Sequence, residues 1–135
     1  MHILVVEDDF ISRRLLCRYL EPFGECDVAV NGEEAVEAVQ AAIEAGEHYD
    51  LICLDIMMPG MDGQETLKSI RGLEQENDIS LGRGARIVMT TGLEDHGNIR
   101  KAFSSSADGY AVKPLEKEKL LEMLVEIGFE FSIPL

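Results

Sequence analysis

Two short apolar runs in this sequence end in carboxylic acids that could take part in chemistry. The run LICL is followed by Asp55, and the run ILVV is followed by Glu7, Asp8 and Asp9. Two unit charges about 4 Å apart repel by roughly 4 kcal/mol at an effective dielectric constant of about 20, so acids gathered at one place need a cation. Oxygen ligands suit a hard ion, and the sequence therefore favours Mg²⁺ at these residues.

Two further apolar runs end in residues that suit a phosphoryl group. The run IVM is followed by two threonines, of which the second is Thr91, and the run GYAV is followed by Lys113. Mg²⁺ commonly binds one or two carboxylates together with a phosphate. The Thr91 hydroxyl can donate to phosphoryl oxygens, and the Lys113 ammonium supplies a compact positive charge. A phosphoryl group is therefore the expected ligand.

A carboxylate that faces an incoming phosphoryl group can itself act as the nucleophile. Asp55 is the best candidate because it stands alone at the end of a run that is apolar throughout, as a central strand would be. Glu7 and Asp8 would then hold the metal ion. Each of these features alone also fits a structural role. The acids could start a helix, and the threonine and the Lys-Pro pair could belong to loops or turns. Only their combination favours phosphoryl chemistry.

The order of apolar and polar residues predicts strands that alternate with helices. Strands are expected at residues 2–7, 26–30, 51–55, 85–91 and 109–113. Helices are expected at residues 10–20, between 31 and 46, from 62 or 63 to 76, within 94–106, and at 116–127. Five strands and five helices in alternation imply one parallel sheet with helices on both faces. The polar residues would then meet at the carboxyl ends of the strands, where ligands bind in such sheets.

The composition indicates a single globular domain. The chain has 135 residues and a formal net charge of −14, with 46% hydrophobic residues. Such an acidic surface repels phosphate backbones and anionic lipids, so we expect neither nucleic acid nor a membrane as a partner. No apolar run approaches a membrane span and no signal peptide is evident, so a cytoplasmic location is expected. The cysteines lack metal or disulfide spacing and are expected to pack as small hydrophobes.

Four motifs follow one another along nearly the whole chain: ILVVEDDF, LDIMMPGMDG, IVMTTG and DGYAVKP. Together they resemble the response-regulator receiver domain of two-component signalling, in its stand-alone, chemotaxis-receiver-like form. The resemblance implies a flavodoxin-like α/β fold, with a doubly wound, five-stranded parallel sheet in the order 2-1-3-4-5 and five helices. It also implies that residues 1–135 form a single receiver domain with no output domain.

The resemblance assigns roles to the acids. Asp55 would be the phosphoacceptor. Glu7 and Asp8 match the acidic pair that holds Mg²⁺, with Asp8 as the direct ligand and Mn²⁺ as an alternative ion. The main-chain carbonyl of Met57 would be a further ligand. Asp9 falls just beyond the pair and is expected to start a helix.

The resemblance also assigns the switch. Thr91 would bind a phosphoryl oxygen, and Lys113 would pair with the acceptor and the phosphoryl group. Tyr110 matches the aromatic residue that turns inward as the threonine moves, and the adjoining Lys113-Pro114 pair favours this role over that of a static residue at the sheet edge. The implied function is that of a response regulator, which accepts a phosphoryl group from a histidine kinase or phosphotransfer protein. Phosphorylation would switch the binding of a downstream protein by the face formed by the last two strands and helices.

Two alternatives belong to other functional classes. The chain could be a pseudo-receiver that binds partners without phosphorylation. It could also be an Mg²⁺-dependent phosphohydrolase with an aspartyl nucleophile, but such enzymes of the haloacid dehalogenase type have a second Asp two residues later, where this chain has Met57. We therefore expect a signalling protein that assists its own phosphorylation and dephosphorylation, not an enzyme acting on other substrates.

Three features are specific to this chain. The segment 73–86 is longer than usual in the family, and we expect a surface insertion, with a partner contact as the alternative. The tail GFEFSIPL is expected to cap the core with its apolar residues, with an exposed docking strip as the alternative. The resemblance implies that the positions of Met57 and Leu93 influence water access to an acyl phosphate, and neither side chain can orient a water molecule. Slow self-dephosphorylation is therefore expected.

Overall fold

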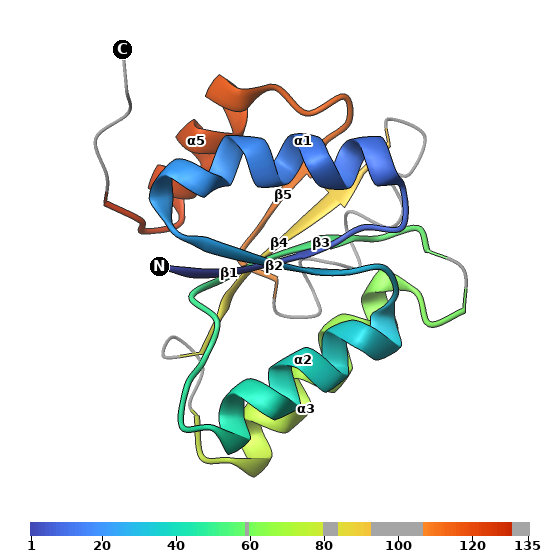
Figure 1. The fold of residues 1–135 in the computed structure, drawn as a ribbon, viewed down its shortest axis with the longest axis vertical. Coiled ribbons are helices and arrows are strands. Elements are labelled where there is room, and N and C mark those ends of the chain that lie inside the picture. Colours follow the sequence, from blue (N-terminus) through green and yellow to red (C-terminus); the bar gives the residue numbers. More distant parts are fainter. Residues whose placement is uncertain (59, 80–83, 93–106, 131–135) are drawn as a thin grey trace.

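One parallel β-sheet organises the molecule (Figure 1). The computed structural model describes residues 1–58, 60–79, 84–92 and 107–130. The strands are β1 (His2–Val6), β2 (Glu25–Ala29), β3 (Leu51–Asp55), β4 (Arg86–Thr91) and β5 (Gly109–Val112). Their order in the sheet is β2-β1-β3-β4-β5, and every pairing is parallel. The predicted strand order is confirmed.

Helices cover both faces of this sheet. The described helices are α1 (Phe10–Leu20), α2 (Gly32–Glu44), α3 (Gly63–Glu76) and α5 (Lys117–Glu126), with a short 3-10 helix η1 at Glu21–Phe23. In Figure 1, α1 and α5 lie on one side of the sheet and α2 and α3 on the other. The doubly wound α/β class is thus confirmed. The fifth helix expected within residues 94–106 lies outside the described residues.

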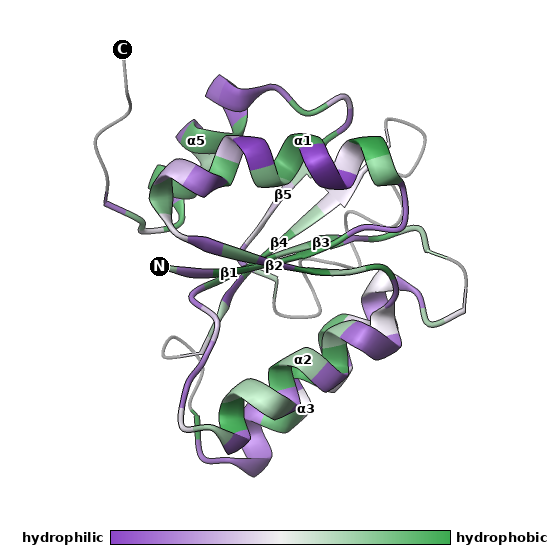
Figure 2. Ribbon diagram, in the orientation of Figure 1, coloured by the Kyte–Doolittle hydropathy of each residue, from purple (hydrophilic) through white to green (hydrophobic). Residues whose placement is uncertain are grey.

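The core consists of two hydrophobic clusters, one on each face of the sheet. β3 is buried along its whole length, and its side chains alternate between the two clusters: Ile52 and Leu54 face α2 and α3, whereas Leu51 and Cys53 face α1 and α5. The central strands are accordingly hydrophobic along their length, while the helices also carry hydrophilic residues (Figure 2). Burial on both faces is what a central parallel strand requires.

Three helices begin where the sequence indicated. The side chains of Asp9, Asn31 and Asp62 accept hydrogen bonds from backbone amides of the first turns of α1, α2 and α3, at 2.9, 2.8 and 2.9 Å. These are N-caps, which satisfy amides that have no partner inside the helix. The expected helix start at Asp9 is therefore observed, and this residue stands apart from the acidic pair that precedes it.

The strands end slightly earlier than the apolar runs predicted. β1, β2 and β5 stop at Val6, Ala29 and Val112, one residue before the expected ends. Glu7 and Lys113 thus follow their strands directly.

Among the described residues, no helix combines the length and the apolar content needed to cross a membrane.

Two chain-specific features are described in part. In the segment 73–86, residues 80–83 lie outside the described residues, but Asn77 closes α3 and the Ala85 amide is held by Glu74. In the tail, Phe129 packs against the core cluster on the α1 and α5 face, as the capping prediction requires, whereas residues 131–135 lie outside the described part. All three cysteines are free; Cys53 is buried and the other two are half-buried.

Candidate functional site

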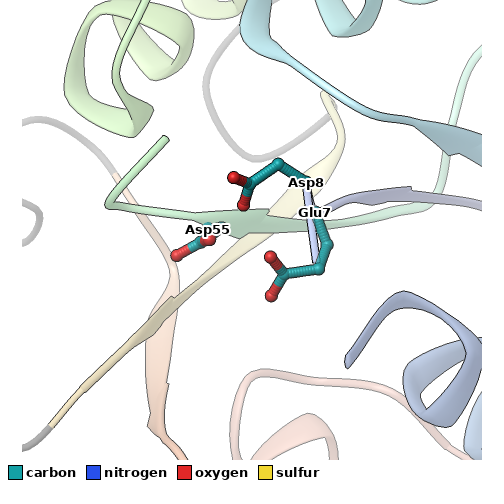
Figure 3. A group of neighbouring side chains, drawn as sticks. All are labelled: Glu7, Asp8 and Asp55. Carbon is teal, nitrogen blue, oxygen red and sulfur yellow. The ribbon is translucent and has the colours of Figure 1, made fainter. Parts of the chain in front are cut away.

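Three carboxylates meet at the carboxyl ends of β1 and β3. Each of Glu7, Asp8 and Asp55 offers an oxygen, and these oxygens lie within 4.8 Å of one another (Figure 3). The sheet causes this proximity, because β1 and β3 are neighbours and Val6 pairs with Leu54. Glu7 follows Val6 and Asp55 follows Leu54, so these two acids lie side by side.

Lys113 reaches this cluster from the edge strand β5. It follows β5 directly, and β4 lies between β5 and β3. Its Nζ lies 2.6 Å from Glu7 Oε1 and 3.5 Å from Asp55 Oδ2. Its backbone amide donates to the Thr91 carbonyl at 2.7 Å, which ties the start of the loop after β5 to the end of β4. The four ionisable residues predicted for the site are therefore in one crevice.

Burial makes the charges of this crevice interact strongly. Glu7 is 0% exposed and Asp55 is 4% exposed. Burial, with the neighbouring Glu7 carboxylate, raises the pKa of Asp55 to about 7, against the opposing effect of Lys113. Burial alone would also raise the pKa of Glu7, but hydrogen bonds with Lys113, Asp55 and the Asp9 amide hold it below its ordinary value. Of the two buried acids, the phosphoacceptor candidate Asp55 is thus the one that ionises less readily.

The cluster has the composition of a hard-metal site. Among the described residues, the cluster holds three carboxylates, and the Lys113 ammonium pairs with two of them, Glu7 and Asp55. Asp8 is exposed, which leaves its carboxylate accessible from solvent. The Met57 amide donates to Asp55 Oδ1 at 3.2 Å, and the role of the Met57 carbonyl as a metal ligand stays a prediction. An all-oxygen, partly open set of this kind fits Mg²⁺.

Two threonines end β4 next to the acids. Both are buried, each 1% exposed. The Thr91 hydroxyl, predicted to bind a phosphoryl oxygen, donates to the Gly92 carbonyl at 3.2 Å. The Thr90 hydroxyl has no hydrogen-bond partner among the described residues. The sequence places both threonines at the end of the strand, but only the pairing of β4 with β3 shows that Thr90 lies opposite Asp55.

Two other residues near the site complete the comparison with the prediction. Tyr110 is half-buried, pairs with Met89 of β4 and packs against the core cluster on the α2 and α3 face. Its switching role stays a prediction.

Arg13, to which the sequence assigned no role, donates to the Glu7 carbonyl at 3.0 Å and to the Asp8 carbonyl at 3.5 Å. Its position one turn into α1 was the only available signal. Leu93 lies outside the described residues.

Comparison with known proteins gives the same family from sequence and from structure. The family model of the response regulator receiver domain matches residues 3–125. The chemotaxis protein CheY of Halobacterium salinarum is 32% identical over 125 residues, which cover 93% of this chain and 94% of that protein. The crystal structure of the CheX-CheY-BeF3-Mg²⁺ complex from Borrelia burgdorferi aligns with a TM-score of 0.80 at 26% identity, covering 96% of this chain and 90% of that chain.

Some relatives are much longer than this chain. The osmosensing histidine protein kinase SLN1 of Saccharomyces cerevisiae is 33% identical over 126 residues, which cover 92% of this chain but only 10% of the kinase. The same kind of domain thus occurs both as nearly a whole protein and as a small part of a large one.

Proposed function

The chain belongs to the family of response regulator receiver domains, and we propose that it takes a phosphoryl group onto Asp55 in a Mg²⁺-dependent reaction. The observation that carries this proposal is the buried Asp55 carboxylate, with Glu7 and Asp8 within 4.8 Å and the Lys113 ammonium at 3.5 Å. Mn²⁺, which prefers the same oxygen ligands, is an expected substitute.

The transfer step follows from the position of Asp55. One of its carboxylate oxygens attacks the phosphorus of the donor, and an electron pair of that oxygen forms the new O–P bond. The bond from phosphorus to the donor breaks, and the leaving group keeps its electron pair. With a histidine donor, the leaving group is the ring nitrogen. Positioning and neutralisation of charge are then most of the catalysis.

The surrounding residues prepare this step. Glu7 and Asp8 would hold the metal ion with the Asp55 carboxylate, and the bound ion supplies charge neutralisation to the phosphoryl oxygens. Lys113 is already directed at the acceptor and can follow the negative charge as it moves onto the phosphoryl group. Arg13 holds the backbone carbonyls of the acidic pair, which keeps the two carboxylates at the end of β1.

Phosphorylation would then bias two states of the domain. It adds negative charge and strong acceptor oxygens to a buried crevice. Thr91 would exchange its bond with the Gly92 carbonyl for a phosphoryl oxygen, and Lys113 would gain an acceptor. Moving a population from 1:99 to 99:1 takes about 5.5 kcal/mol, to which a few charge-assisted hydrogen bonds can contribute a good part. Tyr110, on the edge strand β5, would turn inward as Thr91 moves.

The phosphoryl donor is proposed to be a histidine kinase or a His-phosphotransfer protein, and the output a change in protein binding. For the output we propose the face of β4, β5 and the last helices. A groove of ≈ 480 Å³ runs between β5 and α5 on this face, and its lining includes Tyr110, Lys113, Lys119 and Met123. The site residue Lys113 and the proposed switch residue Tyr110 thus border the same groove.

The remaining parts of the proposal concern the protein as a whole. We propose a cytoplasmic signalling domain that does not turn over other substrates, and the match over nearly all of the halobacterial CheY supports the signalling role. The phosphohydrolase alternative lacks support because Met57, at the position of the second Asp, has no titratable group. Because the Met57 side chain cannot orient water, slow self-dephosphorylation is also proposed.

Intact-mass spectrometry after incubation with acetyl phosphate tests the function directly. We expect one phosphoryl group with Mg²⁺, none with a chelator, and none in Asp55→Asn. Asp78→Asn is the matched control, because Asp78 is exposed in the loop after α3 and should leave uptake unchanged. If the wild-type protein gains no phosphoryl group, the chain is a phosphorylation-independent binding module instead.

A further inference from the structure

The Thr90 hydroxyl is a buried polar group without a partner. Thr90 is 1% exposed, and no described residue makes a hydrogen bond with its Oγ1 atom. Buried hydroxyls are nearly always hydrogen-bonded, because removing one from water without compensation costs free energy. A valine has almost the same shape and would avoid this cost. The hydroxyl therefore points to a partner that is present in another state of the domain.

The register of the sheet identifies where that partner lies. Thr90 on β4 is the cross-strand partner of Asp55 on β3. Two residues earlier, Cys53 and Val88 are also partners, and both belong to the core cluster on the α1 and α5 face. Because side chains two residues apart in a strand share a face, Thr90 and Asp55 extend from the same face as well. Thr91 starts from the opposite face and has its own partner, the Gly92 carbonyl.

Phosphorylation would change the set of donors around the Asp55 carboxyl group. In the unmodified protein, Oδ1 accepts the Met57 amide at 3.2 Å and Oδ2 faces Lys113 at 3.5 Å. In an acyl phosphate one of these oxygens bridges to phosphorus and the other remains a carbonyl. Lys113 is then drawn to the phosphoryl charge, and the carboxyl group is left with fewer donors. A hydroxyl rotates about a single bond and can supply one.

We propose that Thr90 is a further binding residue of the phosphorylated state, whose hydroxyl donates a hydrogen bond to the acyl group of phosphorylated Asp55. This inference rests on the proposed function. Thr90 keeps its proton, so the transfer itself is unchanged. The bond forms only after phosphorylation, and it therefore stabilises the product state relative to the unmodified one.

The test compares side chains that differ in the hydroxyl alone. Beryllofluoride with Mg²⁺, a stable mimic of the phosphoryl group, is titrated into wild-type protein, Thr90→Val and Thr90→Ser. We expect the affinity of Thr90→Val to fall about tenfold, the loss of one hydrogen bond, and that of Thr90→Ser to stay close to wild type. The melting temperature of unmodified Thr90→Val should be equal or higher, because an unpartnered hydroxyl is removed.

A control variant separates the site from the core. Thr66 is also fully buried, but its hydroxyl donates to the Asp62 carbonyl at 2.8 Å within α3. Thr66→Val should lower the melting temperature and leave the beryllofluoride affinity unchanged. If Thr90→Val does not fold, Thr90→Ala provides the same comparison with Thr90→Ser.

Each result decides the inference. Equal affinity of wild type and Thr90→Val overturns it and leaves the hydroxyl with no more than a buried water molecule. Equal weakening in Thr90→Val and Thr90→Ser also overturns it, because the cause is then packing. If the wild type binds beryllofluoride and takes up a phosphoryl group, these outcomes leave the proposed function intact. If it does neither, the proposed function fails and the inference fails with it.

Discussion

The carboxyl and amino ends of the strands differ in how their acidic side chains are paired with basic ones. At the carboxyl ends of the strands, Glu7, Asp8 and Asp55 lie within 4.8 Å of one another, and the Lys113 ammonium pairs with Glu7 and Asp55. At the amino ends of β4 and β5, Arg71 lies between two acids, with nitrogens 2.7 Å from Glu74 Oε1 and 2.9 Å from Asp108 Oδ2. Arg86 lies 3.9 Å from Asp108 as well, so two arginines meet two acids at this end, whereas three acids gather near Lys113 at the other.

Backbone groups complete the balance at the amino end. Glu74 Oε2 accepts the Ala85 amide at 2.7 Å, and Asp108 Oδ2 accepts the Ile87 amide at 2.8 Å. Arg71 also donates to the Ala85 carbonyl at 2.8 Å. These bonds join the C-terminal part of α3 to the starts of β4 and β5. We refer to Arg71, Glu74 and Asp108 as the structural ion cluster.

The comparison shows how one fold separates stability from function. The structural ion cluster has its partners within the chain, so its charges stabilise the ends of three elements. The three acids at the other end lie within 4.8 Å of one another and repel, so we expect them to stabilise a bound cation instead. Three substitutions would break or sharpen this contrast.

Removal of the arginine should have the largest effect. Arg71→Met removes the cation beside the buried Glu74 carboxylate and leaves Asp108 with Arg86, at 3.9 Å, as its ion-pair partner, and we expect the free energy of unfolding to fall by about 3 kcal/mol. Urea denaturation measures this change. Arg18→Met, at an exposed position on α1, should change stability by less than about 0.5 kcal/mol. A similarly small effect at Arg71 would show that its ion pairs contribute little.

The acceptor should make the metal-free protein less stable as the pH rises. The pKa of Asp55 is raised to about 7 in the folded state from 3.8, so folded protein binds the proton more tightly than unfolded chain. This stabilising contribution is complete below the unfolded pKa and is lost as the pH rises towards 7. With a chelator present, we expect the free energy of unfolding to fall by about 2 kcal/mol between about pH 5 and about pH 7.5.

The acceptor variant isolates this effect. Glu7, whose pKa is lowered, contributes stability that is lost only as the pH falls below its ordinary value, so it does not affect the slope above about pH 5. Asp55→Asn should therefore abolish the slope and be the more stable protein at the upper end of the range. Urea denaturation across the pH series checks this, and an unchanged slope in Asp55→Asn would assign it to other groups.

The smallest effect is expected from a cap near the carboxyl end but outside the acidic crevice. Asn31→Ala removes the acceptor of the Glu34 amide at the start of α2, and we expect stability to fall by about 1 kcal/mol. Asn31→Asp keeps the acceptor and should have little effect. Thermal unfolding measures both. Uptake of a phosphoryl group from acetyl phosphate should be unchanged, and a loss of uptake would extend the site to β2.

Local sequence determined the elements and the chemistry at their ends. The strands, the described helices and the caps Asp9, Asn31 and Asp62 follow from periodicity and from side chains that bond within their own turn. The strand ends of β1 and β5 were misplaced by one residue: the Glu7 and Lys113 amides still donate to the Ala29 and Thr91 carbonyls, but strand pairing ends at Val6 and Val112. The order of the strands came from family resemblance, since alternation alone does not specify it.

The tertiary structure decided which of these residues meet. Lys113 lies closer to Glu7 than to Asp55, Arg71 joins acids that are 34 residues apart in sequence, and Thr90 instead of Thr91 lies opposite Asp55. None of these relations has a local sequence signal. They depend on strand pairing and register, which bring distant residues together and set the face from which each side chain extends.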